Sequence, residues 1–550
     1  MQGARFKDGC PEGRSGINQP YKNKKHLGRA VKQDWSKPRR RLAPVIVVSF
    51  VVALAFVGLC YAFSGFVADD AFIVGRYAMN AAQGLGLVYN PGERVSALTS
   101  PLHALIETAL AALGLDPVGA YRVLAPVMVL AGWAAVVRLL VCDGKGIRDV
   151  ILFTIVGLAS PFLILWTVGG LETPLLAMLA TLFAVTVVRA GQRGAASEPA
   201  LLALAVLGGL MFITRYDSLL VTGPVLVVFL VREARRAATW LAVALALAIA
   251  GGWLIFAQVY YGDIFPTSFY VKFAIGTRPR IDSLSSLLNF LLLSGLVLLV
   301  FRLRPGPLSA RPALARALLR AGFVSGVLFL LYAARSAGEH MMFGYRMFLP
   351  YLMPLALLVV LGLPEVTRRL TAIAALWQAG LIATVLFVGI NLAPLTRLPG
   401  LDRAYAEYEF VTPRTYGIFM DMLTEDAKRI NDHWDASGTG GQPRIYLRTG
   451  GTGYWIPDFY VYETLVSYRK NCGLNERSMI EASHYVQGLG FSASAEKVEA
   501  VARERADIGA GAEWLFPTTI DWMGPMETGY FFGSRPETFD LGDDVQGNCD

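Results

Sequence analysis

The sequence predicts an all-α polytopic membrane protein with about eleven transmembrane helices, followed by a C-terminal soluble α/β domain. Three observations lead to this fold class. Hydrophobic residues make up 54% of the 550 residues, apolar stretches recur as far as about residue 392, and charged residues become frequent only beyond that point. A soluble globular protein with one membrane anchor does not need this composition, so that class is excluded.

Residues 1–42 form a basic arm that we expect to be disordered and cytoplasmic. Up to Ala43 the arm carries twelve Lys or Arg residues and three acids, whereas the whole chain has a net charge of +8. The bias of Lys and Arg toward the cytoplasm places this arm inside, so its charge gives no reason to expect a nucleic-acid partner. The uncharged segment from about Leu42 to Phe66 is longer than the ~20 residues that span a bilayer. More than forty residues precede it, so it is not a cleaved signal peptide.

Further spans complete a transmembrane domain over residues 43–392. They are predicted near residues 121–140, 150–168, 171–189, 199–213, 218–231, 239–259, 284–301, 319–334, 347–363 and 371–392. The loops that this count places inside are the basic ones, as the distribution of Lys and Arg requires. An odd number of spans that starts inside ends outside. The short spans around Arg215 also fit half-helices or re-entrant segments.

Residues 393–550 are predicted to form a soluble extracytoplasmic α/β domain. Strand-like runs at Arg444–Arg448 and Tyr460–Tyr468 are separated by glycine-rich turns. Cys472 and Cys549 both fall in this domain. An oxidising compartment would permit a disulfide between them, and two cysteines leave open whether it forms.

The first loop, residues 68–116, is long and patterned. Asp69–Gln83 has the apolar spacing of a surface helix, and Gly84 and Gly86 end it. Leu102–Leu113 is a second amphipathic stretch. We expect two interfacial helices that lie along the outer leaflet and roof a cavity between the membrane helices.

An acid pair, Asp69 and Asp70, stands at the start of the first of these helices. Aspartate at a helix start often caps the backbone N–H groups, and that structural role is as plausible as a catalytic one on this motif alone. Capping needs only one of the two acids. The other can face the space under the loop and act as a general base.

The other outer loops contain groups of complementary charge. Glu172, with Thr173, is expected to cap a helix, and Arg215 either pairs locally with Asp217 or binds a phosphate. Outer loops are normally poor in cations. A set of four cations is nevertheless found in the later outer loops, namely Arg215, Lys272, His340 and Arg346. Such a set suits the phosphate of a lipid headgroup, with Arg for bidentate contacts and Lys as a point charge.

A family resemblance rests on several sequence runs in a fixed order. They are Asp69–Asn80, Gly84–Val95, Thr99–Leu102, Gly169–Leu175, Tyr260–Asp263 with Pro266, and Gly344–Pro350. These runs resemble the motifs of GT-C glycosyltransferases, polytopic enzymes that use polyprenyl-phosphate sugars. The first loop is most similar to that of the group containing the mycobacterial terminal β-(1→2)-arabinofuranosyltransferase. The resemblance covers about residues 45–360.

The resemblance implies that one acid of the pair is the catalytic base, and we favour Asp69, with Asp70 as cap or substrate ligand. Substrate-binding side chains are expected at Arg76, Tyr77, Asn80, Glu93, Thr99, Glu172, Asp263 and Glu339. Glu339 is a departure, because it stands in Gly338-Glu339-His340 where the group has Gly-Gly-Asp. The C-terminal domain matches weakly, so arabinofuranose is one candidate sugar and the acceptor is left open.

The expected activity is inverting transfer of a sugar from a polyprenyl-phosphate donor to a glycan, lipid or protein of the cell envelope. The reaction would take place on the outer face of the plasma membrane. No metal cluster with recognisable ligand spacing is present in the sequence, although an acid and phosphate site can recruit a divalent cation. The main alternative is a transporter or flippase, which predicts ionisable groups near mid-membrane and broken helices in a repeat. A membrane scaffold is a third possibility, but it leaves the outer cations unexplained.

Overall fold

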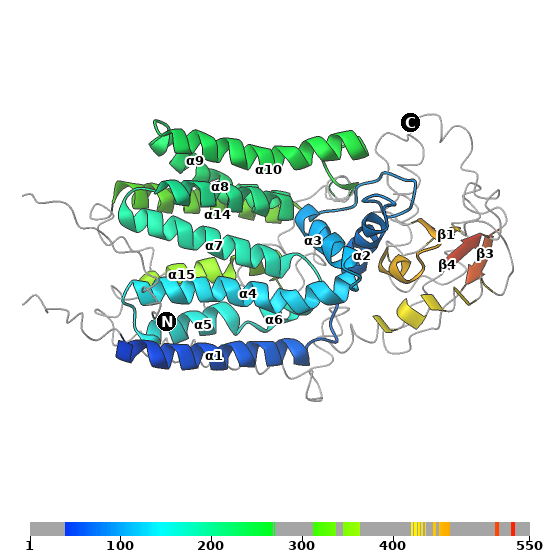
Figure 1. The fold of residues 1–550 in the computed structure, drawn as a ribbon, viewed down its shortest axis with the longest axis horizontal. Coiled ribbons are helices and arrows are strands. Elements are labelled where there is room, and N and C mark those ends of the chain that lie inside the picture. Colours follow the sequence, from blue (N-terminus) through cyan, green and yellow to red (C-terminus); the bar gives the residue numbers. More distant parts are fainter. Residues whose placement is uncertain are drawn as a thin grey trace, which may run out of the picture.

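The structure, a computed structural model, describes residues 39–267, 269, 312–336, 345–362, 444–446, 450–462, 512–515 and 530–533, with separate residues between 420 and 435. Most of this is a helical bundle whose axes run broadly in one direction (Figure 1). The bundle helices are α1 (Arg39–Ala62), α4 (Pro117–Cys142), α5 (Ile147–Leu158), α6 (Pro161–Val168), α7 (Thr173–Arg193), α8 (Glu198–Thr214), α9 (Leu219–Glu233), α10 (Ala237–Tyr261), α14 (Ala313–Ser336) and α15 (Leu352–Gly362). Helix α8 packs along α10, and α4 along α7.

The bundle is that of a multi-pass membrane protein. Within the described ranges, five helices are long and apolar enough to cross a membrane, or six when one bent pair counts as a single span. Many side chains of α1 and α10 are large, apolar and exposed, as expected of surfaces that face lipid. The spans predicted near residues 284–301 and 371–392 lie outside the described residues, so the total of about eleven stays a prediction.

The span predicted over residues 150–168 is not one straight helix. It is divided into α5 and α6, whose axes differ by 62°. The break has a local cause, because Pro161 begins α6 and the Ser160 Oγ accepts a hydrogen bond of 3.4 Å from the Leu163 backbone N–H. Proline lacks the N–H that a continuous helix would need there, and serine is a favoured cap.

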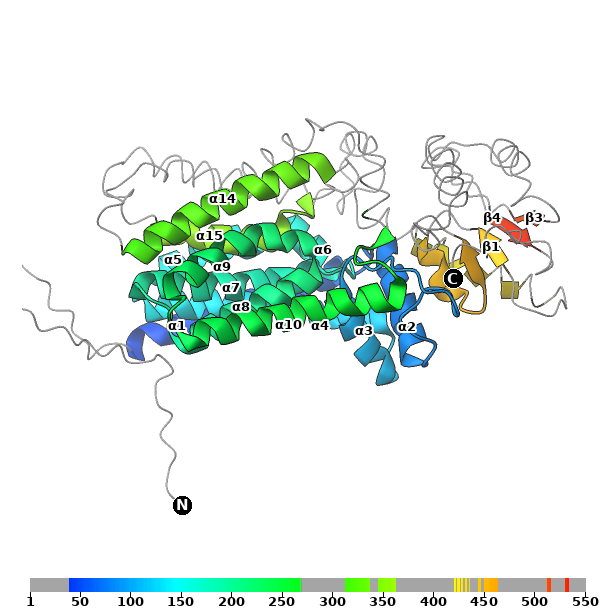
Figure 2. The ribbon, with the colours of Figure 1, turned by 90° about the horizontal axis from the view of Figure 1, so that it is seen from above.

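The first loop contains the two helices that its apolar spacing predicted. Helix α2 spans Asp69–Ala82 and α3 spans Pro101–Ala112. Both lie at one end of the bundle (Figures 1 and 2). The turn after α2 needs glycine, since Gly84 and Gly86 have φ values of 80° and 99°.

The C-terminal region includes a mixed sheet of four strands, which lies beyond α2 from the bundle (Figure 1). The strands are β1 (Arg444–Tyr446), β2 (Tyr460–Tyr462), β3 (Ala512–Leu515) and β4 (Tyr530–Gly533), in the order β2-β1-β4-β3. Strand β1 pairs in parallel with β2, and Ile445 lies opposite Val461. Strand β4 is antiparallel to both β1 and β3. The two strands predicted from sequence begin at the residues where β1 and β2 begin, and Cys472 and Cys549 lie outside the described residues.

A 3₁₀ helix, η7 (Gly450–Trp455), connects β1 to β2 and packs on α2. A compact apolar cluster joins this part of the C-terminal region to the first loop. Its largest members include Tyr77 and Tyr89 from the loop and Phe459 and Val461 from the C-terminal region, all fully or nearly fully buried. The first loop is therefore held between the bundle on one side and the C-terminal region on the other.

Candidate active site

The acid pair occupies the first turn of α2. The N-cap residue of this helix is Ala68, whose side chain makes no cap hydrogen bond. Neither acid therefore occupies the N-cap position, and both lie in the first turn, where they meet the positive end of the helix dipole. The Ala68 N–H donates to the Gly169 carbonyl at 2.9 Å, which ties the start of α2 to the turn before α7. That contact brings the acids close to Glu172.

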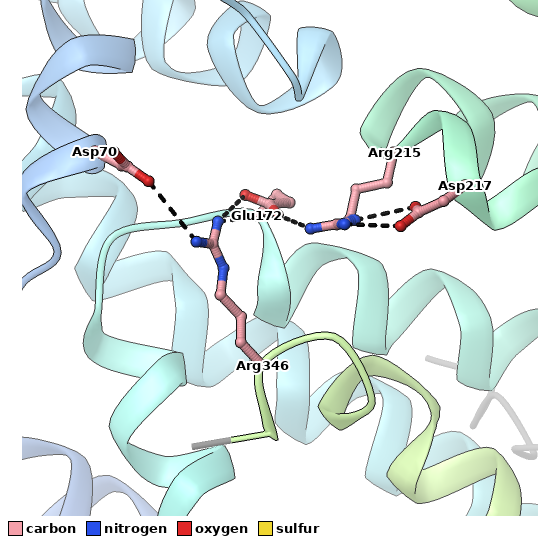
Figure 3. A network of polar contacts seen from close by, with 5 residues as sticks. All are labelled: Asp70, Glu172, Arg215, Asp217 and Arg346. Atoms are coloured by element: carbon pink, nitrogen blue, oxygen red, sulfur yellow. Dashed lines mark hydrogen bonds and ion pairs between the residues drawn. The ribbon is translucent and has the colours of Figure 1, made fainter. Parts of the chain in front are cut away.

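Five side chains from distant parts of the chain meet at this end of the bundle. They form the Arg346 network, which consists of Asp70, Glu172, Arg215, Asp217 and Arg346 (Figure 3). Arg346 lies between two acids. Its Nη1 is 3.8 Å from Asp70 Oδ2, and its Nη2 is 3.4 Å from each carboxylate oxygen of Glu172.

Glu172 is the centre of the network. Its side chain is 3% exposed and accepts a hydrogen bond of 2.9 Å from Arg215 Nη1 as well as the contacts of Arg346. It occupies the cap position of α7 without capping it, so the capping role predicted for Glu172 is wrong. Burial alone would raise the pKa of this carboxyl, but Arg346 and Arg215 lower its pKa from 4.5 to about 2. The group is therefore a carboxylate at neutral pH.

Arg215 makes the local pair expected from its short loop and a second ion pair with Glu172, whereas the phosphate contact stays a prediction. Its Nε and Nη2 donate to the two carboxylate oxygens of Asp217 at 3.0 and 2.7 Å, which is the local pair expected from sequence. Its Nη1 is directed to Glu172. The guanidinium is thus engaged by two carboxylates and fixes Glu172 rather than pointing away from the protein.

Arg346 reaches the network from a strained stretch of backbone. The preceding residue, Tyr345, has a φ of 59°, a left-handed conformation that side chains other than glycine rarely adopt. The Tyr345 ring packs edge-on against Phe162 with centroids 5.0 Å apart. The Arg346 guanidinium carbon lies 5.0 Å from the centre of the Trp166 ring, and the buried Nε has no hydrogen-bond partner. One donor of Arg346 is therefore left unused by the protein.

The network contains more acids than cations. The three carboxylates of Asp70, Glu172 and Asp217 contact only the two guanidiniums of Arg215 and Arg346. The Asp70 side chain is 52% exposed, whereas the other two acids are 3% and 4% exposed. Among these acids it is therefore Asp70 that a substrate can reach, and Arg346 beside it can contact an anion. Proton acceptance next to anion stabilisation is the arrangement that group transfer from a phosphate requires.

Four of the residues expected to bind substrate within the first loop make contacts inside the protein. The side chains of Arg76, Asn80 and Tyr77 donate to backbone carbonyls, those of Asn80 at 2.9 Å and that of Tyr77 at 2.7 Å. Glu93 accepts hydrogen bonds from Asn90 and Tyr460. These side chains therefore have a structural role in the loop, and their roles toward substrate stay predictions.

Other predicted site residues are placed apart from the network or lie outside the described residues. Thr99 is exposed on the loop between the two helices. The Asp263 Oδ1 accepts a hydrogen bond of 3.1 Å from the Phe265 N–H, which closes a turn. Lys272, Glu339 and His340 lie outside the described residues, so their expected roles stay predictions.

Sequence reasoning missed several members of the site. The sequence predicts Asp217 only as a local partner of Arg215, and Trp166 has no signal of its own within the span predicted near residues 150–168. The left-handed backbone of Tyr345 has no sequence signal, because tyrosine is an unusual residue for it. Within the part of the chain that the structure describes, no group of three or more His, Cys, Asp or Glu side chains could hold a metal ion. The divalent cation stays a prediction.

Comparison with known proteins identifies the fold. No protein-family model matches the chain, and no curated protein matches it in sequence. The crystal structure of ArnT from Cupriavidus metallidurans bound to undecaprenyl phosphate matches with a TM-score of 0.50 and 14% identity, covering 90% of this chain and 99% of ArnT. The chain therefore shares its overall fold with ArnT. The GT-C assignment of the sequence motifs stays a prediction that this fold supports.

Two further solved structures resemble this chain more weakly. ArnT from Cupriavidus metallidurans in the apo state has a TM-score of 0.43 and 14% identity, covering 84% of this chain and 85% of ArnT. The cryo-EM structure of the arabinosyltransferase EmbB from Mycobacterium smegmatis has a TM-score of 0.39 and 17% identity, covering 62% of this chain and 32% of EmbB.

Proposed function

We propose that this chain is an inverting glycosyltransferase that moves a sugar from a polyprenyl-phosphate donor to a cell-envelope acceptor on the extracytoplasmic face of the membrane. The observation that carries the proposal is the contact between Asp70 and Arg346 at the end of the bundle, under the first loop. An accessible carboxylate and the terminal nitrogens of a partly exposed guanidinium stand side by side there. These are the two groups that the reaction needs.

The proposed reaction is a single displacement at the anomeric carbon of the donor. The oxygen of an acceptor hydroxyl forms a bond to that carbon as the bond from the carbon to the phosphate oxygen breaks. The hydroxyl proton passes to a carboxylate of the acid pair, and polyprenyl phosphate leaves as an anion. Because one displacement takes place, the anomeric configuration is inverted.

We assign the base to Asp70 in preference to Asp69. Asp70 is the acid that faces the Arg346 network, and its side chain is the exposed one among the network acids. Arg346 is placed to meet the negative charge that develops on the leaving phosphate. Glu172 and Arg215 hold Arg346 in position from the bundle side.

The donor class is supported by two further points. The ArnT structure with the same overall fold was solved bound to undecaprenyl phosphate. The first-loop motif is most similar to that of arabinofuranosyltransferases, so we propose arabinofuranose as the transferred sugar and a glycan as the acceptor. The basic inner loops support placement of the site on the extracytoplasmic face.

Transport of a lipid-linked sugar is the rival function. A transporter would place its ionisable groups near the middle of the helices. In the network, Glu172 directly precedes α7 and Arg215 directly follows α8, so both lie at helix ends. This placement favours chemistry at the membrane surface over passage through the bundle.

The test is transfer by the purified full-length protein in lipid nanodiscs. A panel of polyprenyl-phosphate sugars, including the arabinofuranosyl donor, is supplied with envelope glycan acceptors, and products are identified by mass spectrometry with anomeric configuration from NMR. We expect one donor to give an inverted product with the wild type and none with Asp70→Asn. Asp143→Asn is the matched control, because Asp143 is exposed at the far end of α4. Movement of donor across proteoliposomes without any transfer product would support the transporter instead.

A further inference from the structure

Helix α2 has a second contact that the proposed reaction does not use. It packs against the segment 450–461 of the C-terminal region. The Phe72 ring packs on Trp455 and Tyr454, with centroids 4.4 and 5.2 Å apart. The helix that begins with the acid pair is therefore bound by a segment almost four hundred residues later in the chain.

Arg76 is the main polar connection between the two parts. It is 2% exposed. It donates from Nε to the Tyr89 carbonyl at 2.9 Å, from Nη2 to the Phe459 carbonyl at 2.6 Å, and from Nη1 to the carbonyls of Gly453 and Ile456. One buried guanidinium thus joins the loop to three successive turns of the C-terminal segment. The guanidinium carbon also lies 4.6 Å from the centre of the Tyr89 ring, so hydrogen bonds and a cation–π contact together offset the cost of burying this charge.

Asn90 makes a second, independent connection. Its side-chain amide pairs with the backbone of Val461, accepting from the Val461 N–H and donating to the Val461 carbonyl, both at 3.0 Å. The Tyr460 hydroxyl also donates to Glu93 Oε2 at 2.8 Å. These contacts fix the register of β2 against the loop.

The docked segment lies so close to the first loop that two of its positions require glycine. A Cβ on Gly451 would lie 2.7 Å from the Asp69 carbonyl oxygen and 3.2 Å from the Asp69 Cβ. A Cβ on Gly453 would collide with the Tyr89 hydroxyl. The backbone of η7 therefore rests directly against the first residue of the acid pair.

We propose that Arg76 is a positioning residue for the acid pair. By holding η7 against Asp69, it fixes the first turn of α2 and so the direction of Asp70 toward Arg346. The C-terminal region then completes the active site without contributing a reacting group. The catalytic effect of Arg76 rests on the proposed function. The docking of η7 on α2 does not depend on it.

The geometry supports this role because the first turn of a helix is the part most prone to fray. The N-cap of that turn is Ala68, whose side chain makes no cap hydrogen bond. Two backbone contacts hold the turn: the Ala68 N–H on the Gly169 carbonyl from the bundle, and Gly451 against Asp69 from the C-terminal region. A misplacement of about 1 Å in a catalytic group can cost about 10²-fold in rate.

The experiment combines Arg76→Lys with Gly451→Ala in a double-mutant cycle. Lysine keeps the charge but cannot reach carbonyls in several directions at once. We expect each single variant to lower turnover by about 10-fold to 10²-fold with donor affinity unchanged, and the double variant to lose no more than the larger single loss, since both act on one contact. The control is Gly252→Ala in α10, where an added Cβ has no neighbour within 4 Å. The effects of Gly252→Ala and Arg76→Lys on turnover should be additive when the two are combined.

Amide hydrogen exchange of the full-length protein tests the docking by a measurement that does not depend on activity. Arg76→Lys, and Asn90→Ala as a second variant, should raise exchange over residues 450–461 and the first turn of α2 while the bundle stays protected. Unchanged exchange in both variants would overturn the docking role. Raised exchange with full turnover, or independent losses from Arg76→Lys and Gly451→Ala, would overturn the positioning role. A wild type that docks normally but transfers no sugar would count against the proposed function and leave the exchange result to decide the docking.

Discussion

Arg346 Nη1 lies 3.8 Å from Asp70 Oδ2, so a residue that follows α14 in the sequence contacts the first turn of α2, in the first loop. The same guanidinium contacts Glu172 at the start of α7. Three segments that are far apart in the sequence therefore share one cation. Since Asp70 is the exposed member of this set, the contact marks the point where substrate can approach the network.

Replacement of Asp70 by Asn should reduce sugar transfer by about 10² to 10⁴-fold, the range that a general base contributes. Asparagine keeps the size of the side chain and cannot accept the acceptor proton. Asp69→Asn should cost less, because Asp69 is not in the Arg346 network. Initial rates with a saturating donor compare the two variants. A larger loss in Asp69→Asn would move the base to Asp69, and full activity in both would remove the acid pair from the mechanism.

Arg346→Lys should lower turnover by about 10² to 10³-fold, the scale on which a single stabilising donor acts. Lysine cannot contact Asp70 and Glu172 at once with a planar group, and it loses the stacking on Trp166. The loss should exceed the change in donor affinity, because the leaving phosphate gains charge in the transition state. Turnover and donor binding are measured separately, with Arg148→Lys at an exposed position in the first turn of α5 as control. Equal losses in both quantities would assign Arg346 to ground-state binding only.

The sequence predicted local features of the fold well and the network poorly. Helix α2 begins at Asp69 and α3 at Pro101, because apolar spacing, glycines and a proline signal these positions within a few residues. Arg76 could not be understood in the same way. Its carbonyl partner in Gly453 lies 377 residues away, and no periodicity reports a contact of that kind. The motif therefore suggested a substrate ligand where the structure has an intramolecular connection.

The same limit applies to Arg346 and Glu172. The contact between these two side chains depends on how α7 packs near the segment before α15. Arg346 and Glu172 are 174 residues apart in the sequence. Charge counting predicted that cations gather on the outer face, but it could not show that Glu172 takes up two of them. Glu172 was expected to cap α7 because helix starts favour such residues, and the tertiary ion pairs override this local preference.

Tyr345→Asn should preserve the site better than Tyr345→Val. Both substitutions lose the ring contact with Phe162, so they are matched in that respect. Asparagine tolerates the left-handed backbone at φ 59°, whereas a β-branched side chain adds about 1–2 kcal/mol of strain there. We expect Tyr345→Val to have the lower melting temperature and the larger loss of transfer. Equal behaviour of the two variants would show that the backbone conformation does not set the direction of Arg346.

Glu172→Gln should destabilise the protein at neutral pH and flatten its response to acid. The pKa of Glu172 is lowered to about 2 from 4.5, so its ionised form stabilises the folded state above pH 4.5. That contribution falls as the pH drops from 4.5 toward 2. The wild type should therefore lose melting temperature more steeply than Glu172→Gln over this acidic window. Parallel curves in a detergent-based thermal unfolding assay would contradict the assignment of Glu172 as the buried partner of two arginines.

Glu107 should show the opposite pH dependence, although it too is a buried glutamate near the site. It lies on α3, fully buried, with one oxygen 3.1 Å from His103 Nε2 and the other without a hydrogen-bond partner. Burial raises the pKa of Glu107, and His103 opposes this only in part. A carboxyl with a raised pKa stabilises the folded state at low pH and loses that contribution as the pH rises through its folded-state pKa.

Glu107→Gln removes this titrating group while it keeps the shape of the side chain. Its melting temperature relative to the wild type should therefore increase as the pH is raised above 4.5, the ordinary pKa of a glutamate. Glu172→Gln should instead stay a constant amount below the wild type in that range and approach it only as the pH falls below 4.5. The difference arises because Glu172 contacts two guanidiniums that stay charged at every accessible pH, whereas Glu107 has one imidazole and an unsatisfied oxygen. Thermal unfolding of both variants from pH 3 to 8 measures the two pH dependences in one series. The same pH dependence in both variants would show that burial, and not the identity of the partner, determines how these glutamates affect stability.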